Sequence, residues 1–93
     1  DALAMSDAGV SMVLLEMVPA QLASKITHAI EVPTIGIGAG VDCSGQVLVL
    51  QDLLGIYTGP AEKSPETFKA PRFVRNFLAE TGSVQSAVRA YVL

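Results

Sequence analysis

The chain has 93 residues, of which 51% are hydrophobic and 16% charged, and its formal net charge is -3. An acidic chain with no basic cluster, three Phe, two Tyr and no Trp lacks the charge and the stacking surfaces of a nucleic-acid-binding protein. So small a domain has much surface to cover with polar groups, so we expect something outside these residues to cover part of its apolar surface.

Cys43 is the only cysteine. It excludes an internal disulfide framework and suits the reducing cytoplasm, and no Cys/His grouping has the spacing of metal ligands. No apolar run approaches the roughly 18 residues that a membrane-spanning helix needs. The chain starts at Asp1 within a helical pattern. We therefore expect a cytoplasmic protein with no membrane or nucleic-acid partner, of which these residues form a segment.

The first elements follow a helix–strand–helix pattern. Residues 3–8 have the spacing of a helix tail, which Gly9 ends. Residues 10–17 are nearly continuously apolar, as in a strand that is buried on both faces. Pro19 suits the first turn of the next helix, which ends before Pro33 because a residue preceding proline avoids the helical region. Apolar residues at three- and four-residue spacing predict one buried face of this helix: Leu22, Ala23, Ile26, Ala29 and Ile30.

A second strand is predicted at residues 34–38. The first strand, the helix and this strand together have the length of one crossover unit, which predicts a parallel pair. Residues 46–50 form a third apolar run and are predicted to be a third strand, followed by a short helical turn at 51–55. Glycine and prolines among charged residues predict a loop from Thr58 to Pro71.

Two helices are predicted after this loop. The first ends at Gly82, and its apolar face is formed by Phe73, Val74, Phe77 and Leu78. Ser83 is predicted to cap the second. Its inward-facing residues are expected to be Val84, Ala87, Val88 and Tyr91.

This order of elements predicts an α/β fold with a parallel sheet. Three parallel strands can neither close a barrel nor cover both faces of an open sheet. The order fits the last three βα units and the C-terminal helices of a (β/α)8 TIM barrel, which typically takes about 250 residues. Residues 1–93 would then be the C-terminal segment of a single barrel domain, incomplete as it stands.

Glu16 is the first candidate for a catalytic residue. A carboxylate that ends a buried apolar run must lie where the sheet meets solvent or ligand, and in parallel α/β proteins the active site is built at that carboxyl edge. A half-buried carboxylate at such a mouth suits proton transfer. The alternative is a structural carboxylate paired with an Arg or Lys from elsewhere.

Gly36, Gly38 and Gly40 occupy every second position of the second strand and its extension. On an extended strand they would share one face without side chains, which leaves room for a ligand or for a close-packed neighbour. We therefore consider them candidate substrate-binding residues. The spacing is not that of a dinucleotide-binding or phosphate-binding loop.

Three other polar residues have plainer interpretations. Asp52 follows the third apolar run and is expected to cap a helix or lie in a loop. His28 is expected on the surface of the helix after Pro19. Cys43, in a polar turn with no nearby base, is not expected to be a nucleophile.

Three ordered motifs closely resemble the ketopantoate hydroxymethyltransferase family. They are LEMVP at residues 15–19, PTIGIGAG at 33–40 and CSGQVLV at 43–49, and FVRNFLAETG at 73–82 extends the match. The resemblance implies a (β/α)8 barrel, commonly assembled as a homo-oligomeric decamer. It implies hydroxymethyl transfer from 5,10-methylenetetrahydrofolate to the 2-oxo acid 3-methyl-2-oxobutanoate, a step of pantothenate and coenzyme A biosynthesis.

In that family a Mg2+ ion binds the 2-oxo acid, and the proton-handling glutamate of the E-x-V-P motif corresponds to Glu16. The family's metal ligands and its substrate-binding lysine and histidine lie in earlier strands, so this sequence implies no metal site of its own. Gln51 stands before Asp52 where the family often has histidine. We therefore expect the segment alone to be inactive and to need the remainder of the barrel.

Two other interpretations stay open. A different barrel enzyme could bind a phosphorylated ligand at the glycine run, in which case anion binding would not depend on Glu16. A non-catalytic assembly fragment would instead form a stable oligomer without affinity for metal or folate. The fold alone cannot distinguish these two interpretations from the transferase. The joint occurrence of the three motifs favours the transferase.

Overall fold

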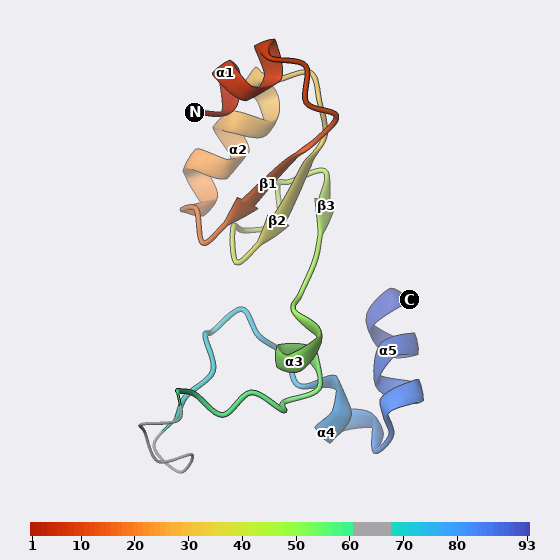
Figure 1. Ribbon diagram of the computed structural model, residues 1–93. Helices are drawn as coiled ribbons and strands as arrows, with labels where there is room; N and C mark the ends of the chain where they lie inside the picture. The colour runs from red at the N-terminus through yellow and green to blue at the C-terminus, as the bar shows by residue number, and fades with distance from the viewer. Residues whose placement is uncertain (61–67) are drawn as a thin grey trace. The chain divides into compact units, whose positions relative to one another are not determined.

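A computed structural model describes residues 1–60 and 68–93 of the chain, as two compact units that comprise residues 1–47 and 48–93 (Figure 1). The first unit contains α1 (Ala2–Asp7), β1 (Val13–Glu16), α2 (Ala20–Ala29), β2 (Thr34–Ile37) and β3 (Gly45–Gln46). The second contains α3 (Leu50–Leu53), α4 (Phe77–Thr81) and α5 (Val84–Val92). Strands and helices alternate in the first unit, which confirms the predicted α/β class.

The three strands form one sheet in the order β1-β2-β3, and both neighbouring pairs are parallel. Val13 is the register partner of Thr34 and Glu16 that of Ile37, so β1 and β2 begin and end at the same level. The predicted parallel pairing is therefore confirmed. The strand predicted at 10–17 is shorter than expected because only Val13–Glu16 pairs with β2.

The core of the first unit lies between the sheet and α2, which runs beside the strands in Figure 1. Val13 and Leu15 of β1 point into it, whereas Leu14 is 60% exposed. The expectation that this strand is buried on both faces is thus wrong for the chain as described. Side chains alternate between the faces of a strand, and only one face of β1 is packed. The buried residues of this core are Val13, Leu15, Ala23, Ile30 and Ala39.

The connection from β2 to β3 consists of residues 38–44 and contains no helix. This segment, the crossover, leads the chain back to pair Gly45 with Ile35 in parallel. The third strand is much shorter than the run predicted at 46–50 because only Gly45–Gln46 pairs with β2, and Leu50 already belongs to α3. Hydrophobicity alone does not separate a strand from the start of a short helix in such a run. The helical turn predicted at 51–55 is confirmed in α3.

The second unit has its own small core. Its buried residues are Leu53, Leu54 and Ala87, and its partly buried ones are Leu48, Phe77, Leu78 and Tyr91. Gly82 follows the last residue of α4, and its φ of 82° places it in the left-handed region, as expected for the predicted helix stop. The Ser83 hydroxyl accepts a hydrogen bond from the Ser86 N–H and caps α5, also as predicted.

Two expectations about these helices are wrong. The helix predicted from Phe73 begins only at Phe77, because the Asn76 side chain accepts a hydrogen bond from the Ala79 N–H and thereby caps α4. Val84 and Val88, predicted to face inward, are 55% and 38% exposed.

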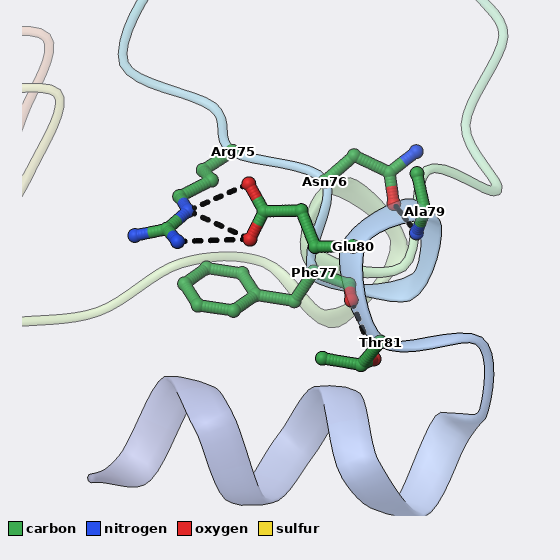
Figure 2. Close-up of polar contacts among 6 residues, drawn as sticks. All are labelled: Arg75, Asn76, Phe77, Ala79, Glu80 and Thr81. Atoms are coloured by element: carbon green, nitrogen blue, oxygen red, sulfur yellow. Dashed lines mark hydrogen bonds and ion pairs between the residues drawn. The ribbon is translucent and has the colours of Figure 1, made fainter.

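An ion pair precedes α4 on the surface of this unit. The Arg75 guanidinium donates hydrogen bonds of 2.9 and 3.0 Å from Nε to the two carboxylate oxygens of Glu80, and it lies 4.8 Å from the centroid of the Phe77 ring (Figure 2). These hydrogen bonds, aided by charge attraction, lower the pKa of Glu80 below its ordinary value and raise that of Arg75.

Part of the loop predicted from Thr58 to Pro71 lies outside the described residues, which stop at Pro60 and resume at Phe68. The described flanks contain no helix or strand, in agreement with the prediction. Across residues 1–60 and 68–93, no helix is both long and apolar enough to cross a membrane.

Candidate functional site

Glu16 is the last residue of β1 and lies at the carboxyl edge of the sheet. Its register partner Ile37 is the last residue of β2, so Gly38 leaves the sheet beside it. The side chain of Glu16 is exposed rather than half-buried as expected, because the far face of β1 is not packed. The placement at the edge where parallel α/β proteins build their sites agrees with the sequence analysis.

The backbone directly after Glu16 is unusual. Met17 has a φ of 55°, and it is the only residue other than glycine with a positive φ in the described part of the chain. Its N–H donates a hydrogen bond of 2.9 Å to the carbonyl oxygen of Ile37, which continues the ladder of β1 and β2 by one residue. Backbone strain of this kind is concentrated at functional sites. Local sequence rules give no signal for it, since methionine rarely adopts this conformation.

The three glycines do not share one face of a strand, contrary to expectation. β2 ends at Ile37, and Gly38 and Gly40 have φ values of 64° and 84°, outside the extended region. They form a turn, which we call the glycine turn (residues 38–40), at the same edge as Glu16. Gly36 lies inside β2 and is buried.

Two of these glycines let other parts of the chain approach closely. A Cβ atom at Gly36 would lie 2.9 Å from Cys43 Sγ, so the crossover passes over β2 where no side chain is present. A Cβ atom at Gly40 would lie 2.6 Å from the Cβ atom of Ala20 in the first turn of α2. Close packing, one of the two alternatives left open by the sequence, therefore accounts for Gly36 and Gly40. Substrate binding by the three glycines stays a prediction.

The sequence analysis missed a group of hydroxyl side chains. Thr34, fully buried at the start of β2, exchanges two hydrogen bonds of 3.1 Å with Ser44: the Thr34 N–H donates to Ser44 Oγ, and the Ser44 N–H donates to Thr34 Oγ1. Thr34 Oγ1 also lies 2.8 Å from Thr27 Oγ1 of α2. The sequence signal that could have pointed to this group is the position of Thr34 as the first residue of a strand predicted to be apolar. A hydroxyl that becomes buried there needs a hydrogen-bond partner.

Of the remaining polar residues, His28 lies where it was predicted, whereas Asp52 does not. His28 is exposed on α2, and its Nδ1 lies 2.7 Å from the Ser24 carbonyl oxygen. Asp52 lies within α3, in the second unit, and the caps of this helix are Val49 and Leu54, so the expectation that Asp52 caps a helix or lies in a loop is wrong. Cys43 is half-buried and packs against the core of the first unit.

No three His, Cys, Asp or Glu side chains within residues 1–60 and 68–93 lie close enough together to hold a metal ion. Among the described residues there is thus no ready-made set of three such metal ligands. What the edge offers is one exposed carboxylate beside a turn in which Gly38 and Gly40 have no side chain and that of Ala39 is buried in the core. That arrangement can accept or donate a proton at a small molecule bound against the turn.

Comparison with known proteins gives a consistent result. A family model described as ketopantoate hydroxymethyltransferase matches residues 1–93. Over 92 residues the chain is 54% identical to a protein of Neisseria meningitidis serogroup A, 56% to one of Cupriavidus taiwanensis and 53% to one of Burkholderia vietnamiensis. Each of the three is named 3-methyl-2-oxobutanoate hydroxymethyltransferase.

The matches cover 99% of this chain but 32%, 30% and 31% of those relatives. The chain thus spans about a third of the length of the curated relatives it matches. The expectation that this third is the C-terminal one is not confirmed by the extent of the match.

Proposed function

This chain belongs to the ketopantoate hydroxymethyltransferase family, and we propose that the protein containing it transfers a hydroxymethyl group from 5,10-methylenetetrahydrofolate to 3-methyl-2-oxobutanoate, giving 2-dehydropantoate. The observation that carries the proposal is 54% identity across 92 residues to a relative of that name. The carbon–carbon bond forms between C3 of the oxo acid and the one-carbon unit, with a water molecule consumed and tetrahydrofolate released.

We propose that Glu16 handles the proton in this reaction. C3 of the oxo acid must lose its proton before it can attack the one-carbon unit, and a carboxylate within hydrogen-bond reach of that carbon is a suitable base. Glu16 is exposed at the carboxyl edge of the sheet, where a substrate can reach it. Within residues 1–60 and 68–93 no ion pair with an Arg or Lys involves Glu16, so the structural alternative weighed above has no support in these residues.

The glycine turn is proposed to form part of the wall against which the oxo acid binds. Gly38 follows the register partner of Glu16, so a ligand at the Glu16 carboxylate would contact backbone rather than side chains at this turn. Backbone N–H groups in such turns can contact carboxylate oxygens closely.

The complete protein is proposed to be a cytoplasmic (β/α)8 barrel that assembles as a homo-oligomer. Parallel strands with helical packing on one face support this architecture, and the barrel would need further strands and helices from the rest of the chain. The Mg2+ ion implied by the family would polarise the substrate carbonyl. Its ligands are proposed to lie outside the described residues.

The decisive experiment replaces Glu16 in the full-length protein and measures folate-dependent turnover of 3-methyl-2-oxobutanoate. We expect Glu16→Gln to lower kcat roughly 10²- to 10⁴-fold, the usual contribution of general acid–base catalysis. The matched control is Glu31→Gln, because Glu31 is an exposed carboxylate just before the start of β2, away from the carboxyl edge. Wild-type activity in both variants would remove Glu16 from the mechanism.

The wild-type protein gives the test of the activity itself. No turnover of the oxo acid with 5,10-methylenetetrahydrofolate, with or without Mg2+, would contradict the proposed reaction. Exchange of the C3 proton of the oxo acid for deuterium isolates the Glu16 step, because it needs no folate. We expect this exchange in the wild type, and its loss in Glu16→Gln.

A further inference from the structure

The Ser44 N–H and the hydroxyl groups of Thr34 and Thr27 form a chain of hydrogen bonds with one direction. Thr27 Oγ1 donates its hydrogen to the Ala23 carbonyl oxygen at 2.8 Å, and a hydroxyl has only one hydrogen to donate. The hydrogen bond between Thr27 Oγ1 and Thr34 Oγ1 is therefore donated by Thr34. Thr34 Oγ1 in turn accepts from the Ser44 N–H. Thr34 thus connects α2 to the last residue of the crossover.

The crossover is held at two points, residues 40 and 44. At residue 44 the two hydrogen bonds with Thr34 fix the backbone beside the start of β2. At residue 40 the Gln46 side chain donates a hydrogen bond of 2.9 Å from Nε2 to the Gly40 carbonyl oxygen. Between these points Cys43 packs over Gly36. The crossover has no helix of its own, so these side-chain contacts do the positioning that a helix would do.

We infer that Thr34 is a positioning residue that holds the glycine turn beside Glu16 through its hydrogen bonds to Ser44 at the opposite edge of the sheet. The inference rests on the proposed function, since it assigns the glycine turn to substrate binding. Thr34 lies at the amino end of β2 and Gly38 just past its carboxyl end, so Thr34 acts through the crossover and not by contact with substrate.

We expect loss of the Thr34 hydroxyl to weaken binding of the oxo acid more than it slows proton transfer. The backbone at Glu16 is held by the ladder of β1 and β2 and by the hydrogen bond of Met17 to Ile37, none of which involves the crossover. The glycine turn depends on the crossover. A loosened crossover should therefore raise KM for the oxo acid and leave kcat nearly unchanged.

The test compares Thr34→Val with Thr34→Ser in the full-length protein. Valine keeps the shape of threonine but removes the hydroxyl, whereas serine keeps the hydroxyl. We expect Thr34→Val to raise KM for 3-methyl-2-oxobutanoate roughly threefold to tenfold, the order expected for losing the hydrogen bond from the Ser44 N–H, and Thr34→Ser to restore it. The matched control is Thr81→Val, because the Thr81 hydroxyl bonds only within the second unit.

Amide hydrogen exchange supplies a readout that does not depend on activity. The Ser44 N–H loses its acceptor in Thr34→Val and should exchange roughly threefold to tenfold faster, whereas the Met17 N–H should be unaffected. Unchanged exchange at Ser44 would overturn the proposed contact.

The activity outcomes separate the positioning role from the proposed function. Faster exchange at Ser44 with an unchanged KM would overturn the positioning role and leave the transferase function standing. A parallel fall of kcat and thermal stability, also in Thr34→Ser, would reduce Thr34 to a structural residue. A wild-type protein without turnover would overturn the transferase function, and with it any role of Thr34 in that reaction.

Discussion

Met17 adopts a left-handed backbone directly after the proposed catalytic glutamate, at a cost of about 1–3 kcal/mol that its surroundings must offset. The hydrogen bond from its N–H to the Ile37 carbonyl oxygen is one such contribution. The position of Glu16 could be predicted from sequence, because a charge that ends an apolar run marks the edge of a sheet. The conformation of Met17 could not, because it opposes the local preference and depends on contacts with β2.

At Gly40, too, one reason for the residue is local, its backbone conformation, and the other is tertiary, a contact with α2. Its positive φ and the nearby Cβ atom of Ala20 both act against a side chain at this position. The sequence predicted that the glycines admit either a ligand or a neighbour. Only the fold shows that at Gly36 and Gly40 a neighbour is present, since Cys43 and Ala20 come from other elements.

A pair of glycine substitutions separates these two causes. Gly9 also has a positive φ, 94°, but no atom lies within 4 Å of a Cβ built there. Gly9→Ala should cost about 1–2 kcal/mol of unfolding free energy through backbone strain alone. Gly40→Ala should cost about 1–3 kcal/mol more, because Ala20 must also move. Urea denaturation of the full-length variants measures both, and equal costs would argue against close packing at Gly40.

Among the elements, those whose ends carry local signals were predicted best. α2 lies where Pro19 and Pro33 bound its apolar pattern, and α5 begins where Ser83 predicts its cap. The third strand and the start of α4 were predicted poorly. In both cases an apolar run continues past the true boundary, which pairing with β2 and capping by Asn76 decide. The crossover was predicted only as a turn, because nothing local marks its contacts with Thr34.

The ion pair at α4 predicts a pH dependence of stability. Hydrogen bonds from Arg75 lower the folded-state pKa of Glu80 below its ordinary value of 4.5. A carboxyl whose pKa is lower in the folded than in the unfolded state stabilises the fold above its unfolded-state pKa. That contribution is lost as the pH falls through the folded-state pKa. Arg75, whose pKa is raised, stays charged throughout.

Glu80→Gln should therefore destabilise the full-length protein at neutral pH and have progressively less effect as the pH falls below about 4.5. The measurement is thermal unfolding of wild type and variant between neutral and strongly acid pH. Because the pair is exposed, 1 M salt should shrink the difference. Glu31→Gln should show no comparable dependence, and an equal effect of both variants at every pH would contradict the assignment to the Arg75 pair.

On the scale of the whole chain, apolar surface remains uncovered. Leu14 on the far face of the sheet and Met12 before it are 60% and 57% exposed, and Leu22 on α2 is 49% exposed. An expectation from composition was that something outside these residues covers apolar surface, and these side chains are where it would do so. The relatives that match the chain are about three times its length, so those proteins contain further chain beyond the matched part.

This surface leads to a prediction for the isolated segment. Residues 1–93 expressed alone should have no detectable hydroxymethyltransferase activity and should bind a dye specific for exposed apolar surface far more strongly than the full-length protein does. Sedimentation should also show concentration-dependent association. Replacing Leu14 with a polar residue should reduce dye binding by the segment. A monodisperse, active segment would contradict the proposal that the site needs the rest of the barrel.

The crossover without a helix has a consequence for the order in which the sheet assembles. Only residues 38–44 separate β2 from β3, whereas residues 17–33 separate β1 from β2. The entropy lost on closing a flexible loop grows with the logarithm of its length, and each doubling costs about 0.6 kcal/mol. Bringing β2 and β3 together in the unfolded chain therefore loses less loop-closure entropy than bringing β1 and β2 together. β2 and β3 share fewer register partners in the folded sheet than β1 and β2 do. They are nevertheless the pair that comes together more often in the unfolded chain.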